Sequence, residues 1–504
     1  MALSKMAVRA AAGPRVATGG HQRRSTRAAA SRRQVGAAAL GSDADEIEML
    51  EMMLQRARER QQTPAAPAAP EPASGAYDGP AFCIQTFNAI SSVGLERFPQ
   101  GQYAVSGDAS ELPNSAMAVM LRSHKLQEDE VPDTVRCIAR CGAGTNNIPV
   151  ARMTELGIPV FNTPGANANA VKELVVCGLL LASRGITEGI NHVSDVIMPE
   201  EDGDHEAISK RIEKDKSMFV GQEIAGRTLG VIGLGQIGGR VVDAALALGM
   251  NVVGYDPALS LEAAWRLPGD RMHRAGSLDE LLKRSDYITL HVPYIKGVTH
   301  HLLDEEALKL CKPNVHLLNF ARGEIVDGVA LRKMYDRGQM TGKYVSDFSD
   351  AALNGHPKHL VMPHLGASTG EAEENSAAMA ADTIKAFLEE GIIRNSVNFP
   401  TTVPATKQGY ARLCIVHENV PGVLGELTTY LGDKNINITQ QINNSAGEVA
   451  YTVIDMKEVP EDPDQMQEEL AEACPGIISS RFIGSVFQDS LGQPGTFFKI
   501  YSGR

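Results

Sequence analysis

The sequence contains no long run of apolar residues and few cysteines or aromatic side chains. Its longest apolar run, Leu174 to Ala182, is about half as long as the roughly 18 residues that cross a bilayer, so we expect no membrane-spanning segment. The seven cysteines are scattered through 504 residues and form no CxxC pair. This spacing predicts neither a disulfide framework nor a metal site, and we interpret the cysteines as reduced thiols. Hydrophobic residues at 43% and charged residues at 22% are ordinary for a folded globular protein.

Acidic residues are missing from the first part of the chain. Residues 1–42 contain eight Lys and Arg but no Asp or Glu, so the rest of the chain carries −13 − 8 = −21. An acidic body disfavours nucleic acid as a partner, because affinity for phosphate backbones rests on clustered basic residues. The acid-free start, rich in Arg, Ala and Ser, is typical of an organellar transit peptide, and a disordered basic tail is the alternative. We expect import into the plastid stroma, with the mitochondrial matrix as the alternative.

Composition and periodicity divide the remaining chain into segments. Residues 43–78 combine a short helical pattern with a Pro/Ala-rich linker. Beyond them, apolar runs such as Ala118–Leu121 and Arg136–Arg140 have the length of strands and alternate with helical patterns such as Val171–Ser183. This alternation predicts an α/β fold of parallel sheets covered by helices. Prolines at 398–404 then mark a boundary before a shorter module.

One strand and turn have the pattern of a dinucleotide site. The apolar strand Thr228–Ile232 runs directly into a GxGxxG turn made by Gly233, Gly235 and Gly238, and a helical pattern follows. Glycines let the backbone approach a pyrophosphate, and the helix N-terminus offers it free N–H groups. Asp256 ends the next strand, 18 residues beyond Gly238, where a carboxylate binds the adenosine ribose and repels a 2′-phosphate. The pattern predicts NAD in preference to NADP.

Two polar residues follow later apolar runs. Arg322 comes at the end of the run that starts at Leu317, and His364 follows Leu360–Met362. Ligands of open parallel sheets bind at the carboxyl ends of strands, where a guanidinium can bind a carboxylate through two hydrogen bonds. An imidazole is a natural proton carrier near neutral pH. Each residue taken alone is more often structural than catalytic.

The glycine turn, Arg322 and His364 together resemble the NAD-dependent D-2-hydroxyacid dehydrogenases. The loop 142–148 and the segment 161–173 also match that family, and the similarity is greatest to members that oxidise 3-phosphoglycerate in the first step of L-serine biosynthesis. The resemblance implies two Rossmann-like, doubly wound parallel-sheet domains. It implies that a substrate-binding domain, 79–182 and 364–400, is split around an NAD-binding domain at 183–363.

The same resemblance assigns roles to individual residues. Arg322 binds the substrate carboxylate and His364 is the acid/base, with NAD as cofactor and 3-phosphoglycerate as substrate. For Arg122 and Lys125 a solvated charged turn is the alternative interpretation. The residues expected at the substrate are Arg122, Ser123, Lys125 and Gly144. The residues expected at NAD are Thr145, Gly233, Gly235, Gln236, Ile237, Gly238, Asp256, Val292, Phe320, Ala321, Gly366 and Ala367.

One departure from the family concerns the third catalytic residue. The family supports its histidine with a glutamate roughly thirty residues after the arginine, but no Glu lies between positions 324 and 371. Asp347 or Asp350 could support His364 with a shorter side chain. Lys343 could instead carry the proton if desolvation lowered its pKa. The sequence leaves these alternatives open.

The C-terminal module at 408–485 has the pattern βαββαβ and resembles an ACT domain, a sensor of small molecules. That resemblance implies L-serine as an effector held by His417, Asn419 and Asn437 between paired modules, and therefore a homo-oligomer, a dimer or tetramer. A module used only for assembly is the alternative, and the tail at 486–504 has no assigned role.

Two other functions of the whole protein stay open: a glyoxylate or hydroxypyruvate reductase, and an NAD-sensing scaffold of the co-repressor type.

Overall fold

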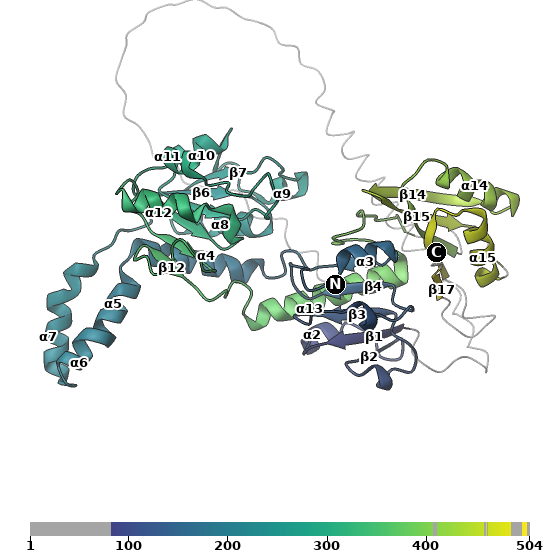
Figure 1. Ribbon diagram of the computed structural model, residues 1–504, viewed down its shortest axis with the longest axis horizontal. Helices are drawn as coiled ribbons and strands as arrows, with labels where there is room; N and C mark the ends of the chain where they lie inside the picture. The colour runs from purple at the N-terminus through teal and green to yellow at the C-terminus, as the bar shows by residue number, and fades with distance from the viewer. Residues whose placement is uncertain (1–81, 407–410, 458–459, 461, 485–495, 501–504) are drawn as a thin grey trace, which may run out of the picture. The chain divides into compact units, whose positions relative to one another are not determined.

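The computed structural model describes residues 82–406, 411–457, 460, 462–484 and 496–500 (Figure 1). The predicted transit peptide at 1–42, the helix and linker at 43–78 and most of the tail lie outside the described residues. The described residues form three sheets. The two parallel sheets and the separate antiparallel one confirm the predicted fold class.

The first sheet is parallel and has five strands in the order β2-β1-β3-β4-β5. Apart from the partly exposed edge strand β2, its strands are mostly buried on both faces, as expected for parallel strands between layers of helices, and Ile84, Met120 and Phe161 are fully buried. The strands are β1 (Phe82–Phe87), β2 (Tyr103–Ser106), β3 (Ala118–Leu121), β4 (Cys137–Arg140) and β5 (Val160–Phe161). The short helices α2 (Ser92–Leu95) and α3 (Val150–Glu155) belong to this part.

Helix α13 (Gly370–Glu390) returns to this first sheet from far along the chain. It begins at Thr369, whose hydroxyl accepts a hydrogen bond from the backbone N–H of Ala372, and it ends at Gly391, which has φ +71°. The helix packs against α2, β3 and β4 (Figure 1). Segments far apart in the sequence thus pack together around the first sheet.

The second sheet is also parallel and has seven strands in the order β12-β11-β10-β9-β6-β7-β8. Its strands are β6 (Thr228–Ile232), β7 (Asn251–Tyr255), β8 (His273–Arg274), β9 (Tyr287–Leu290), β10 (His316–Asn319), β11 (Tyr344–Ser346) and β12 (His359–Val361). The helices between them are α8 (Gln236–Ala247), α9 (Leu261–Arg266), α10 (Leu278–Arg284), α11 (Glu305–Leu310) and α12 (Gly328–Asp336).

Helix α4 (Ala168–Ser183) packs on the second sheet, whereas the predicted boundary at 182 placed it in the first domain. Its buried residues Val171, Val175 and Leu179 share a hydrophobic cluster with Leu229 on β6 and Leu318 on β10. The apolar stripe at helical spacing predicted a buried face correctly. It could not predict which of two sheets that face covers.

A helical arm that the sequence did not predict follows α4. It consists of α5 (Ile186–His192), a π-helical turn (Val193–Ile197), α6 (Met198–Glu200), α7 (His205–Asp215) and a 3-10 turn (Lys216–Phe219), and Figure 1 shows α5 and α7 as a hairpin. The arm leaves large apolar side chains exposed, since Ile190 and Met218 are each 62% accessible.

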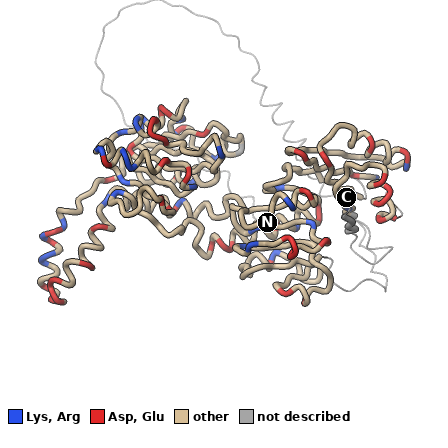
Figure 2. Tube along the Cα trace, in the orientation of Figure 1, with Lys and Arg blue, Asp and Glu red and all other residues tan. Residues whose placement is uncertain are grey.

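The C-terminal module has the predicted βαββαβ order around an antiparallel sheet, β14-β15-β13-β16-β17. Its elements are β13 (Ala411–Glu418), α14 (Val423–Asp433), β14 (Ile438–Ala446), β15 (Val449–Met456), α15 (Pro463–Ala473) and β16 (Ile477–Gly484). The tail adds the unpredicted strand β17 (Thr496–Ile500), which pairs with β16. Helix α15 carries Asp and Glu but no Lys or Arg, so its surface is acidic (Figure 2).

The module and the first domain share one hydrophobic core. Tyr451 on β15 belongs to the same buried cluster as Phe161 on β5 and Phe387 on α13. The Tyr451 hydroxyl donates a hydrogen bond of 2.9 Å to the carbonyl of Gly391, directly after α13. Arg412, buried and paired with Asp455, donates to the carbonyl of Glu390 at 2.7 Å. The module is thus joined to the end of α13 by packing and by hydrogen bonds.

No helix of the described residues is long and apolar enough to cross a membrane.

Candidate active site

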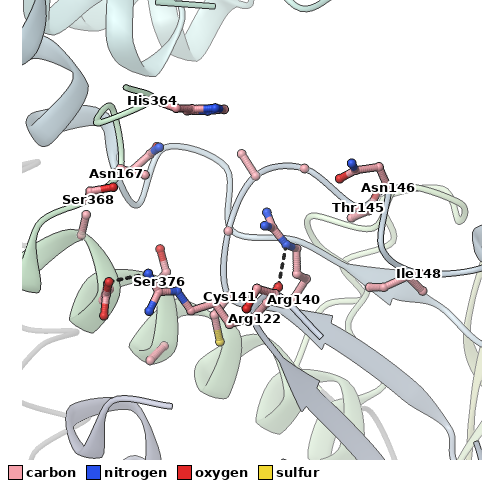
Figure 3. Close-up of a pocket in the computed structure, with 18 of the residues that line it drawn as sticks. Arg122, Arg140, Cys141, Thr145, Asn146, Ile148, Asn167, His364, Ser368 and Ser376 are labelled. Carbon is pink, nitrogen blue, oxygen red and sulfur yellow. Dashed lines mark hydrogen bonds and ion pairs between the residues drawn. The ribbon is translucent and has the colours of Figure 1, made fainter. Parts of the chain in front are cut away.

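A cavity of about 1060 Å³ lies where polar side chains follow several strands of the parallel sheets (Figure 3). The loop after β3 contributes Arg122 and Ser123, and the loop after β4 contributes Thr145. Arg322 follows β10, and His364 follows β12. Because ligands of open parallel sheets bind beyond the carboxyl ends of strands, this placement is the one expected for an active site.

The cavity is strongly basic because Arg122, Arg140 and Arg322 all line it. Burial lowers the pKa of Arg140, and so do the positive charges of Arg122 and Arg322 nearby. The Nε of Arg140 donates a 3.1 Å hydrogen bond to the carbonyl of Arg122 (Figure 3). A Cβ placed on Gly144 would lie 3.7 Å from Nη1 of Arg140 and 3.9 Å from Nη2 of Arg322, so two guanidinium groups converge on this glycine. Such a cluster suits a small ligand with several negative charges.

Arg140 was not among the predicted site residues. The sequence did contain an indication of its role. Arg140 is the last residue of the apolar strand Cys137–Arg140, and Arg122 likewise comes at the end of an apolar strand, Ala118–Leu121. The adjacent Cys141 also lines the cavity, but burial raises the pKa of its thiol to about 12. The thiol is therefore protonated and unreactive at neutral pH.

His364 is held in an unusual backbone conformation. Its φ of +57° lies in the left-handed region, which non-glycine residues seldom adopt. Asp347 fixes the chain directly after it: one carboxylate oxygen accepts from Leu365 N at 2.7 Å and the other from Gly366 N at 2.8 Å. Asp347 is only 2% exposed. The structure therefore places Asp347 as a group that positions the histidine backbone.

The two other candidates for the third catalytic position make different contacts. Lys343 pairs with Glu188 on α5 at 2.6 Å and donates to the carbonyl of Leu181 at 3.4 Å, and it is not among the residues that line the cavity. Asp350 accepts a hydrogen bond from Ala352 N within its own loop. The proton-carrying role of Lys343 stays a prediction, and these contacts do not support it.

The glycine turn after β6 has the shape that a dinucleotide needs. Gly233 has φ +90°, and a Cβ there would lie 2.6 Å from the carbonyl oxygen of His291. A Cβ on Gly238 would lie 1.9 Å from the carbonyl oxygen of Gly233, so the turn and the helix approach too closely for any side chain. Gly235, the residue before α8, faces open space instead. These residues fit a pyrophosphate at the N-terminus of α8.

Asp256 lies beside this turn at the end of β7. Its Oδ2 accepts from Leu234 N at 2.8 Å, and its Oδ1 accepts from Ala258 N at 2.9 Å. The carboxylate is thereby fixed next to the glycine turn, where the ribose of a dinucleotide lies in Rossmann folds.

The other predicted cofactor positions fall into two groups. Thr145, Ala321 and Ala367 line the cavity. The remaining positions do not line it. Phe320 belongs to the hydrophobic cluster that contains residues of α4, and Ile237 and Val292 pack against hydrophobic clusters. The backbone N–H of Gly366 donates to Asp347, and the side chain of Gln236 accepts from Arg266.

The structure separates the predicted substrate residues. Arg122, Ser123 and Gly144 line the cavity. Lys125 is exposed and does not line it. The other positively charged side chains that line the cavity are those of Arg140 and Arg322.

The three predicted effector residues all belong to the C-terminal module. His417 is 3% exposed, with Nε2 at 2.9 Å from the hydroxyl of Thr452 and Nδ1 at 2.8 Å from the carbonyl of Glu418. Asn419 is exposed and donates to the carbonyl of Gly447 at 3.0 Å. Asn437 lies directly before β14.

Comparison with known proteins agrees with this geometry. Residues 198–366 match the family described as D-isomer specific 2-hydroxyacid dehydrogenase, NAD binding domain. The D-3-phosphoglycerate dehydrogenase of Escherichia coli (strain K12) is 31% identical over 376 residues, which cover 72% of this chain and 86% of that protein. The chain belongs to the D-isomer-specific 2-hydroxyacid dehydrogenases. As a member of this family it is an NAD-dependent oxidoreductase.

Two further matches are more limited, one in the share of the relative that is covered and one because it shows the fold alone. The D-3-phosphoglycerate dehydrogenase of Methanocaldococcus jannaschii is 33% identical over 332 residues, 65% of this chain and 58% of that protein. The structure of D-mandelate dehydrogenase from Rhodotorula graminis matches with a TM-score of 0.51 at 22% identity, covering 65% of this chain and 100% of that one. No group of three His, Cys, Asp or Glu that could hold a metal occurs among the described residues.

Proposed function

We propose that this dehydrogenase oxidises 3-phosphoglycerate to 3-phosphohydroxypyruvate with NAD, the first step of L-serine biosynthesis by the phosphorylated route. The observation that carries the proposal is the convergence of Arg122, Arg140 and Arg322 on a cavity that also contains His364. A substrate with a carboxylate at one end and a phosphate at the other matches this excess of positive charge. The names of the Escherichia coli and Methanocaldococcus jannaschii relatives support the same substrate.

The three arginines and the histidine of the cavity each have a task in this reaction. Arg322 binds the carboxylate and orients the carbon that carries the hydroxyl group. His364 accepts the hydroxyl proton, and Asp347 holds the backbone that carries His364. Arg122 and Arg140 bind the phosphate at the far end. NAD, when bound, supplies the acceptor for the hydride that leaves the same carbon.

Two other functions make different demands on the cavity. A glyoxylate or hydroxypyruvate reductase acts on a substrate without a phosphate, and it has no need of a second and third arginine. An NAD-sensing scaffold needs neither Arg322 nor His364. An initial-rate survey of phosphorylated and unphosphorylated 2-hydroxyacids with NAD and NADP separates the three, because the proposal requires kcat/KM to be highest for 3-phosphoglycerate with NAD. Equal or greater values for D-glycerate would favour the reductase, and no turnover of any acid would favour the scaffold.

We propose that the C-terminal module is an ACT domain and that L-serine is its effector, and the βαββαβ order around an antiparallel sheet supports this. The exposed amide of Asn419 and the position of Asn437 before β14 support a binding site for an amino acid on the module surface. Contacts of the module with Glu390 and Gly391 offer a mechanical connection to α13, whose first turn lines the cavity. Coupling of about 1–3 kcal/mol between two sites is enough for useful inhibition.

Titration of L-serine against activity and thermal stability tests the effector, with L-alanine as the control ligand. Inhibition that weakens in Asn419→Ala supports the proposed site. Inhibition that Asn419→Ala leaves unchanged would place the sensor elsewhere, and no effect of serine on either measurement would make the module an assembly device.

We further propose a homo-oligomer and an organellar location. An apolar groove on the arm, lined by Ile186, Ile190 and Phe219, offers a surface that a second copy could bury. Light scattering should give a multiple of the chain mass, and Ile190→Asp should lower it, whereas His205→Asp, outside the groove, should not. The basic, acid-free residues 1–42 support import into the plastid, and a fluorescent fusion of those residues tests plastid against mitochondrion.

A further inference from the structure

The cavity contains a carboxylate on the arginine that the proposed function assigns to the phosphate. Among the described residues that line the cavity, Glu373 is the only acidic one. Its Oε1 forms an ion pair and a hydrogen bond with Nη2 of Arg122. The two side chains are 41% and 42% exposed, so a ligand that enters the cavity can reach the pair.

The ion pair is built entirely within the first domain. Arg122 directly follows β3, and Glu373 lies in the first turn of α13. The backbone N–H of Glu373 donates to the carbonyl of Thr369 at 3.2 Å. Because α13 packs against β3, the chain just after β3 and the first turn of α13 lie close together. The carboxylate also lies near the N-terminus of its helix, where negative charge is favourable. The topology of the first domain thus brings the two partners of the pair together.

The same contact conflicts with phosphate binding. Three arginines and one glutamate give the cavity 3 − 1 = +2 with neutral histidine. A carboxylate on the guanidinium of Arg122 uses donors that a phosphate would need, since both groups bind arginine through oxygen atoms in the same geometry. A phosphate monoester carries about −1.5 to −2 charge and three acceptor oxygens, so it competes for Arg122 better than a carboxylate or another monoanion does.

We propose that Glu373 is an internal anion that occupies the phosphate end of the cavity until the phosphate of the substrate displaces it. This inference rests on the proposed function for the identity of the substrate. Because its carboxylate occupies the guanidinium of Arg122, Glu373 weakens the binding of every anion there. A small monoanion then binds Arg122 poorly, whereas a dianion still competes well with Glu373 for it. It thus determines which anions the distal end of the cavity accepts.

The variant Glu373→Gln tests the proposal, since it removes the charge and keeps the size of the side chain. KM for 3-phosphoglycerate should fall about two- to fivefold, the range expected for a partly exposed ion pair. The dissociation constant of inorganic phosphate, measured by calorimetry on the full chain, should fall by a similar factor. KM for D-glycerate, which has no phosphate, should stay the same.

Glu374→Gln is the matched control. It removes the same charge from the same turn of α13, but Glu374 is exposed and does not line the cavity. KM for 3-phosphoglycerate and the dissociation constant of inorganic phosphate should both stay within about 1.5-fold of their values in the unmodified protein, because exposed charges away from a ligand contribute little to its binding. If Glu374→Gln lowered both constants as much as Glu373→Gln, a general electrostatic effect would replace the proposed one.

Three outcomes would overturn the proposal. A higher KM and a weaker phosphate affinity in Glu373→Gln would mean that Glu373 orients Arg122 for the phosphate. Unchanged constants would mean that the phosphate does not meet Arg122. No binding of inorganic phosphate to the unmodified protein or to Glu373→Gln would exclude an anion site at this end. If 3-phosphoglycerate were not turned over at all, the proposed function would fail, whereas the calorimetric comparison would still decide the role of Glu373.

Discussion

The contact between Asp347 and the backbone after His364 makes Asp347→Asn an informative perturbation. Asp347 is 2% exposed and accepts two short hydrogen bonds, from Leu365 N at 2.7 Å and Gly366 N at 2.8 Å. His364 itself has φ +57°, a conformation that costs a non-glycine residue about 1–3 kcal/mol. The carboxylate thus holds a strained segment in place.

The size of the effect follows from these bonds. An asparagine offers one acceptor oxygen, and its NH₂ group would face the second backbone N–H. One charge-assisted hydrogen bond is then lost, which costs about 2 kcal/mol for a buried group. If the lost hydrogen bond destabilises the conformation that places His364 for proton transfer by this amount, kcat decreases about 30-fold, because each 1.36 kcal/mol is a factor of ten in rate. NAD binding, which depends on the glycine turn after β6, should change little.

Steady-state kinetics with a separate measurement of NAD affinity checks this prediction. The comparison is Asp350→Asn, which should lower kcat less than about threefold because the carboxylate of Asp350 accepts from Ala352 N within its own loop. A positioning role also leaves the shape of the pH profile of kcat/KM unchanged. A loss of less than threefold in Asp347→Asn, or a displaced acidic limb with little loss of kcat, would refute the reasoning and make Asp347 a direct partner of the imidazole.

Four further predictions follow from the site and the second domain. Asp256→Ala should narrow the preference for NAD over NADP by at least about tenfold in kcat/KM, since the carboxylate that repels a 2′-phosphate is gone; an unchanged ratio would contradict this. Arg322→Lys should lower kcat/KM more than about tenfold, because an ammonium cannot form two parallel hydrogen bonds to a carboxylate. His364→Asn should abolish most turnover and Lys343→Met should be mild, because Lys343 pairs with Glu188; the reverse order would give Lys343 the proton. Burial, aided by the charge of Lys343, lowers the pKa of His316 to about 4, so between about pH 6.5 and 4 the unfolded chain binds a proton that the folded protein excludes. This histidine should therefore contribute about 3 kcal/mol to the loss of stability as the pH falls from 6.5 to 4, and denaturant unfolding of His316→Gln should show a loss smaller by that amount.

The sequence predicted elements with sharp local boundaries most accurately. Ala118–Leu121 and Thr228–Ile232 are strands in the structure with the predicted bounds. Each is a short apolar run that ends at a glycine or a charged turn, so periodicity and turn chemistry agree. Arg322 and His364 were predicted from their position after such runs, and both line the cavity.

The features that the sequence did not predict depend on contacts between distant segments. The stripe of Val171, Val175 and Leu179 predicted a buried helix face, but both sheets offered an apolar surface to cover. Glu373 lies 251 positions after Arg122, and only the return of α13 to the first sheet brings the two together. A pair of this kind has no local signal, because neither residue departs from an ordinary exposed charge until the topology is known.

The shared core of the first domain and the C-terminal module has a consequence for how this enzyme can be dissected. Truncation after residue 400 would uncover Phe387, which belongs to the same buried cluster as Tyr451 and whose ring centroid lies 3.8 Å from the guanidinium carbon of Arg481 on β16. It would also remove the hydroxyl that binds the carbonyl of Gly391 at the end of α13. A catalytic fragment cut there would therefore expose apolar surface and aggregate, so the role of the module is tested by point substitutions and not by deletion.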